Sequence, residues 1–156
     1  FDIYGSGAQV AGIKALTGDG QGELPVGPLA GLVSYCGLLP REDVGKIYAE
    51  ADCLMLQIGL YSSLSMVIPT KIFEYAATPY PILFGATGFT SVFIGQVSGA
   101  IGFDQCNAES FLAAVESARY VSVNREERQQ FLDQYDAQVI YRAYAAHILD
   151  PGDPRL

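Results

Sequence analysis

Strand-length apolar runs alternate with amphipathic, helix-length segments along most of this chain, and this alternation constrains the fold more than any single motif. The runs predicted as strands are 1–4, 32–36, 53–58, 82–85 and 99–103. Helical spacing of apolar residues predicts helices over 8–16, over 41–51 and from residue 69 or 70 onward. Such an alternation indicates an α/β fold, with a Rossmann-like parallel sheet covered by helices on both faces. Ligands in these folds bind at the carboxyl ends of the strands.

The C-terminal part of the chain, 119–156, is predicted to be helical. Three polar residues are in position to cap the helices of this part and the helix before it: Asn107, Asn124 and Asp136. The helix after Asn107 is expected to reach about residue 118 and to bury Phe111, Leu112 and Val115. By contrast, the segment 17–31 is rich in glycine and proline, which predicts a loop.

The composition excludes several classes of protein. The chain has 156 residues, half of them hydrophobic, which is enough for one globular domain with a core. A net charge of −8 argues against a nucleic-acid partner, because binding a phosphate backbone needs clustered cations. The apolar runs are far shorter than a membrane span, so we expect no transmembrane segment. Cys36, Cys53 and Cys106 lack the close spacing of a metal cluster, which predicts free thiols in a reducing compartment.

The stretch 68–77 has the features of an anion site. Pro69 and Thr70 are suited to the start of a helix, with Thr70 as its cap, and the first N–H groups of a helix attract phosphate. Four residues are expected to face the core: Ile72, Phe73, Ala76 and Ala77. Lys71 and Glu74 share the other side, three residues apart. When those two residues are considered alone, an ordinary exposed ion pair is the better explanation.

The sequence Pro69-Thr70-Lys71-Ile72-Phe73-Glu74-Tyr75-Ala76-Ala77, followed by Pro81-Ile82-Leu83, resembles a signature of GT-B glycosyltransferases of the retaining family 4. The resemblance extends from about residue 1 to 115 and includes the segment 33–52. It implies that Glu74 holds the ribose of a nucleotide-sugar and that the helix start faces the diphosphate. It also places the nucleotide base near the loop 37–40 and wraps the loop 59–67 around the sugar and diphosphate. The donor-binding residues it implies are Glu74, Lys71, Thr70, Pro69, Gly37, Leu38 and Ser65.

One residue departs from the family pattern. Many members carry a second glutamate where this chain has Met66, and a thioether can neither carry a carboxylate's charge nor accept hydrogen bonds as well. The resemblance therefore leaves the recognition of the sugar, and the identity of sugar and nucleotide, open.

The resemblance further implies that residues 1–156 are the C-terminal, donor-binding half of a GT-B enzyme, without its first strand and helix. A nucleotide-sugar would be the donor, a carbohydrate or lipid-linked molecule the acceptor, and no metal or cofactor would be needed. The acceptor-binding N-terminal domain would be a partner, and the catalytic residues stay unknown. We expect a cytoplasmic protein that reaches a membrane surface only through that missing domain. The fragment alone is expected to transfer no sugar and to have an open sheet edge, covered by a second copy or by the rest of the parent.

Two other functions are compatible with the same fold. A non-catalytic domain would keep the GT-B shape for association with other proteins, which an acidic surface with exposed tyrosines suits. A nucleotide-sugar epimerase of this fold would need further acids and a histidine in a cleft between two domains. The chain has a single histidine, His147, so this alternative has less support.

Overall fold

The computed structural model describes residues 1–17, 28, 29 and 31–149, and the chain divides into two compact units. Unit 1 contains residues 1–49 and unit 2 begins at Glu50. Each unit has a parallel sheet of its own, with two strands in the order β1-β2 and three in the order β3-β4-β5. The α/β class with parallel strands is therefore confirmed, but the strands form two sheets where the alternation predicted one.

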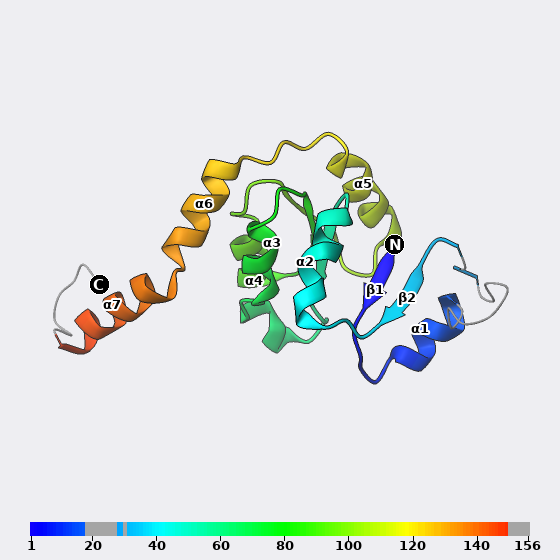
Figure 1. Cartoon of the computed structure of the whole chain (residues 1–156), viewed down its shortest axis with the longest axis horizontal. Helices are drawn as coiled ribbons and strands as arrows, with labels where there is room; N and C mark the ends of the chain where they lie inside the picture. Colours follow the sequence, from blue (N-terminus) through cyan, green and yellow to red (C-terminus); the bar gives the residue numbers. More distant parts are fainter. Residues whose placement is uncertain (18–27, 30, 150–156) are drawn as a thin grey trace. The chain divides into compact units, whose positions relative to one another are not determined.

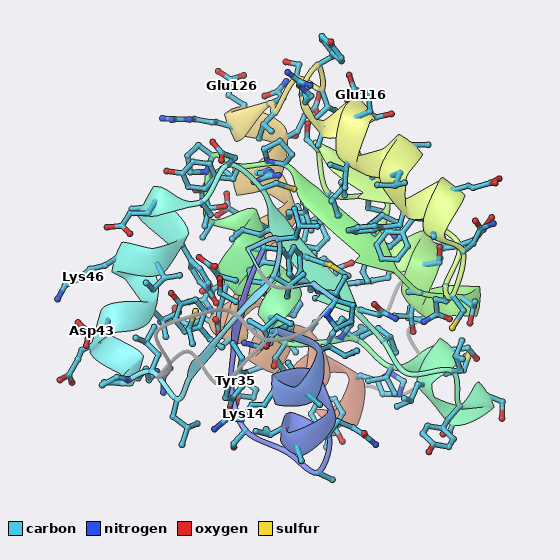
Figure 2. The ribbon with its side chains drawn as sticks, turned by 90° about the vertical axis from the view of Figure 1, so that its right-hand side faces the viewer. Lys14, Tyr35, Asp43, Lys46, Glu116 and Glu126 are labelled. Atoms are coloured by element: carbon cyan, nitrogen blue, oxygen red, sulfur yellow. The ribbon has the colours of Figure 1, made fainter. Side chains whose placement is uncertain are left out.

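Unit 1 is a strand–helix–strand–helix arrangement. Its elements are β1 (Asp2–Tyr4), α1 (Val10–Thr17), β2 (Ser34–Gly37) and α2 (Arg41–Glu50), whose last residue belongs to unit 2. The Tyr35 hydroxyl donates to the carbonyl of Gly5 at 2.7 Å, and Lys14 Nζ lies 5.5 Å from the centre of the Tyr35 ring (Figure 2). Most of the predicted loop 17–31 lies outside the described residues. The run 1–4 was predicted as a strand of a sheet covered on both faces, yet Asp2 and Tyr4 of β1 and the preceding Phe1 are exposed.

The sheet of unit 2 is formed by β3 (Leu54–Gln57), β4 (Ile82–Gly85) and β5 (Ala100–Gly102). Every residue of the central strand β4 is buried, as a short continuous apolar run predicts for a strand covered on both faces. The strands pair in parallel, with Leu83 opposite both Met55 and Ile101. These three side chains pack with α5, and their neighbours along the strands point to the opposite face.

Helices cover both faces of this sheet (Figure 1). The remaining elements of unit 2 are η1 (Ser62–Met66), α3 (Lys71–Ala76), α4 (Gly88–Ile94), α5 (Ala108–Ala118), α6 (Arg125–Gln134) and α7 (Ala137–Leu149). Helix α5 packs on β4 and β5, whereas α3 contacts β3 and α6, and α4 contacts β4 and η1. The core is thus built from both faces of a small parallel sheet.

An aromatic cluster joins α3, α4 and α6. It consists of Phe73, Phe89, Phe93, Phe131 and Tyr135, with contacting ring centres 5.0 to 6.2 Å apart. Phe93 and Phe131 are almost fully buried, so this cluster is one of the contacts that hold α6 on the unit.

The predicted caps are confirmed. The side chains of Asn107, Asn124 and Asp136 accept hydrogen bonds from the first turns of α5, α6 and α7. The expected core face of α5 is right only for Phe111, which packs against the core with its ring centre 5.2 Å from that of Phe103. Leu112 and Val115 are exposed, and Ala114 is the buried residue of the helix. Ala114 packs with Leu83 of β4 and with Phe103, so α5 presents a small residue to this part of the core.

Candidate functional site

The candidate site follows the carboxyl end of β3. After Gln57 the chain runs through a loop that includes the 3₁₀ helix η1 and then enters α3 at Lys71. The N–H of Ile72 donates to the carbonyl of Pro69 at 3.0 Å, and that of Phe73 donates to Thr70 at 3.2 Å. Pro69 therefore supplies the first accepting carbonyl of the turn, which leaves the N–H of Lys71 at its open end.

The predicted capping role of Thr70 is wrong. Its φ of −59° and ψ of −28° are helical, and its side chain makes no capping hydrogen bond. A capping side chain acts from an extended backbone, which directs its oxygen toward the N–H groups two and three residues ahead. Thr70 is already part of the turn, so its exposed hydroxyl points elsewhere.

At most positions of α3, the side chains are exposed or buried as the sequence predicted. Lys71 and Glu74 are both exposed, while Ile72 and Ala76 are buried. Phe73 is half-buried in the aromatic cluster, as expected for a core-facing position at the rim. Ala77, expected in the core, is exposed because the helix ends at Ala76 and the chain turns away there.

Tyr75, which the sequence pattern left unassigned, fixes α3 on the sheet. Its hydroxyl donates to the carbonyl of Met55 in β3 at 3.3 Å. Burial, with a smaller contribution from the negative charge of Glu74, raises the pKa of the Tyr75 hydroxyl, which keeps it protonated as a donor. The exposed residues of α3 are thereby presented from a helix with a fixed orientation.

The loop 59–67 contains the other predicted contacts. Ser65 is half-buried, and its hydroxyl donates to the carbonyl of Ser62 at 2.7 Å. Met66 is exposed, so the residue that replaces the family's glutamate faces outward. Several large apolar side chains of this loop and its flanks are exposed: Leu60, Tyr61, Met66, Val67 and Ile68.

Gly37 and Leu38 belong to unit 1. Gly37 is the last residue of β2 and has a φ of +77°, a left-handed conformation that favours glycine. Its carbonyl accepts from the N–H of Gly5 at 2.7 Å. Leu38 is exposed at the loop that follows. The structure thus gathers Ser65, Pro69, Thr70, Lys71 and Glu74 within one segment of unit 2 and describes Gly37 and Leu38 in the other unit.

Sequence reasoning missed two residues whose side chains hydrogen-bond the backbone of this segment or of the strand ends next to it. Thr90 in α4 is fully buried and hydrogen-bonds the backbone of the loop 59–67. Gln105, after β5, donates from its side-chain amide to the carbonyls of Ile58 and Gly85, at the carboxyl ends of β3 and β4. A threonine on a short helix and a glutamine in a loop give no periodic signal, and only their tertiary partners reveal their role.

Arg128 of α6 was also missed. Its guanidinium is almost fully buried and donates to the carbonyls of Tyr75, Thr78, Tyr80 and Ser98. It therefore binds the C-terminal end of α3, where the helix dipole favours a cation, and joins it to the turns before β4 and β5.

The described residues contain no group of three or more side chains able to hold a metal ion. In this part of the chain no helix combines the length and apolar character needed to cross a membrane. The cysteines, all described, are free thiols as predicted. Unit 2 is accordingly an α/β unit with helices on both faces of its sheet, in which the loop after β3 leads into an exposed, charged helix start. No protein-family model, curated protein or solved structure matches the chain.

Proposed function

We propose that unit 2 binds the diphosphate and ribose of a nucleotide-sugar, as the donor-binding part of a glycosyltransferase that acts on a polysaccharide or glycolipid acceptor. The observation that carries the proposal is the presentation of Lys71 and Glu74 on the exposed side of α3, directly after the strand β3 and its loop. The same segment carries the family-like motif.

The charges of the segment suit the two parts of such a ligand. The ammonium of Lys71 and its backbone N–H at the open start of the turn would attract the diphosphate. The carboxylate of Glu74, one turn further along, would accept hydrogen bonds from the ribose hydroxyls. During sugar transfer, the cation would stabilise the negative charge that develops on the departing diphosphate, which lowers the barrier without a metal.

A calorimetric binding assay on the whole chain tests the proposal with two variants. Lys71→Ala should weaken binding of a ribonucleoside diphosphate by about 1.5–3 kcal/mol and leave the nucleoside unaffected, because only the diphosphate offers negative charge. Glu74→Gln should weaken binding of the ribonucleoside diphosphate but not of its dideoxyribose analogue, which lacks the hydroxyls that Glu74 would hold.

Two exposed residues of α5 and its end provide matched controls. Arg119→Ala removes a cation and Glu109→Gln removes a carboxylate elsewhere on unit 2, so both should bind like the wild type. Equal losses in the variants and their controls would show a general charge effect and contradict the assignment. Absence of binding to any ribonucleoside diphosphate would reject the proposed function.

A non-catalytic association domain is the second candidate, and α7 is the observation that favours it. Large apolar side chains of this helix are exposed: Val139, Ile140, Tyr141, Tyr144 and Ile148. A chain that binds no nucleotide but forms dimers through this helix would support the second candidate over the first.

A further inference from the structure

The loop 59–67, which contains η1, is held by a single buried side chain of α4. The Thr90 hydroxyl oxygen lies 2.9 Å from the carbonyl oxygen of Leu64 and 2.7 Å from that of Val67. It also accepts a hydrogen bond from the N–H of Val67 at 3.1 Å. A hydroxyl has one proton, so it donates to one of the two carbonyls at a time and accepts from Val67 throughout.

A second contact in the same place restricts the loop further. Gly88, the first residue of α4, has a φ of +61°. A Cβ atom added there would lie 3.0 Å from both the Cβ and the carbonyl oxygen of Ser65. A side chain at this position would therefore crowd Ser65, and the positive φ also favours glycine there.

Helix α4 is a rigid base for these contacts. Phe93 and Ile94 are almost fully buried, and Phe93 contacts the rings of Phe73 and Phe131. The loop is thus attached to an element that is itself fixed in the core, although the loop exposes most of its own side chains.

We propose that Thr90 is a positioning residue for the ligand site: its buried hydroxyl holds the loop 59–67 in one conformation, so that the loop meets the diphosphate–sugar part of the donor without first being ordered. This inference rests on the proposed function. A loop ordered in advance binds more tightly because less conformational entropy is lost on binding. Thr90 lies beneath the loop and acts through it, so the effect belongs to the part of the ligand that the loop contacts.

The test uses the full chain with Thr90→Val, which keeps the shape of the side chain and removes the hydroxyl, and Thr90→Ser, which keeps the hydroxyl. Hydrogen exchange measured by NMR reports the Val67 amide, which donates to the Thr90 hydroxyl at 3.1 Å and to the Leu64 carbonyl at 3.4 Å. The shorter of these two contacts is lost only in the valine variant. Calorimetry compares the diphosphates of adenosine, guanosine, cytidine and uridine with the corresponding nucleosides. The matched control is Thr78→Val, which removes a hydroxyl that donates to the Tyr75 carbonyl at 2.8 Å at the opposite end of α3.

Thr90→Val should speed exchange of the Val67 amide and weaken binding of the preferred diphosphate, each by roughly tenfold, with nucleoside binding unchanged. Thr90→Ser should restore both values, and Thr78→Val should change neither. Unchanged exchange at Val67, or an equal loss for diphosphate and nucleoside, would overturn the positioning role. If the wild type binds no diphosphate, the proposed function and the role of Thr90 toward a ligand both fail. A bound diphosphate with an unaltered Val67 amide rejects the role of Thr90 alone.

Discussion

At the scale of single residues, Arg128 shows how a buried charge is accommodated without a carboxylate. Neither of the ion pairs formed within the described part of the chain, Lys46–Asp43 and Arg119–Glu116, involves it. Its partners are instead backbone carbonyls, and burial lowers the pKa of the guanidinium. The ordinary value lies so high that the group stays charged at neutral pH, and the carbonyl dipoles compensate the charge.

Replacement of Arg128 by lysine should destabilise the chain although the charge is kept. An ammonium cannot donate to carbonyls at the end of α3 and in two separate turns with the geometry of the planar guanidinium, so buried carbonyls lose their donors. We expect the free energy of unfolding in urea to fall by about 3 kcal/mol. The matched control is Arg125→Lys, one turn earlier and exposed, which should change it by less than about 0.5 kcal/mol. Similar values for the two variants would show that the carbonyl contacts contribute little.

At the scale of elements, the strands and capped helices were predictable because their signals are local. The strand over residues 82–85 is found where the apolar run placed it, and α6 begins directly after its predicted cap, Asn124. The face that a helix buries was less predictable. It depends on what lies opposite, as the exposed Leu112 of α5 and the buried Tyr75 of α3 show.

The candidate site was predictable only in part for the same reason. The exposure of Lys71 and Glu74 follows from helical periodicity, whereas the absence of a Thr70 cap follows from the turn that begins at Pro69. Thr90 and Arg128 act on backbone atoms more than twenty residues away in sequence, and no local pattern encodes such contacts.

The two asparagine caps of unit 2 offer a prediction at this scale. The Asn124 side chain accepts from the N–H groups of Glu126 at 3.0 Å and Glu127 at 3.3 Å, and its amide donates to the Glu127 carboxylate at 3.0 Å. The Asn107 side chain accepts only from Ser110, at 3.0 Å. Asn124→Ala should therefore lower the free energy of unfolding by about 1–2 kcal/mol and Asn107→Ala by about 1 kcal/mol or less. Urea unfolding of the two variants in parallel measures the difference, and the reverse order would contradict it.

At the scale of the whole molecule, apolar burial is unequally divided between the two units. Among the described residues, every buried hydrophobic side chain lies in unit 2, from Leu54 to Phe131. In unit 1 the buried residue described is Thr17, and its sheet has two parallel strands. Sheets of two strands are marginal without an apolar face packed against another element. Burial of apolar surface is the main source of stability, so we expect unit 2 to contribute most of the free energy of unfolding.

Hydrogen exchange of the full chain should reveal this division. In unit 1 the N–H of Ser34 donates to Phe1 at 2.8 Å, and in unit 2 that of Phe103 donates to Phe84 at 2.9 Å. Geometry alone would give these two amides similar protection. Because exchange depends on the free energy of opening the surrounding structure, we expect the Ser34 amide to exchange by local opening and the Phe103 amide only on global unfolding. Increasing urea below the unfolding midpoint should accordingly speed exchange at Phe103 much more steeply than at Ser34. Equal protection and equal urea dependence would show that the two units unfold together, and that unit 1 is stabilised by more than the packing seen in its described residues.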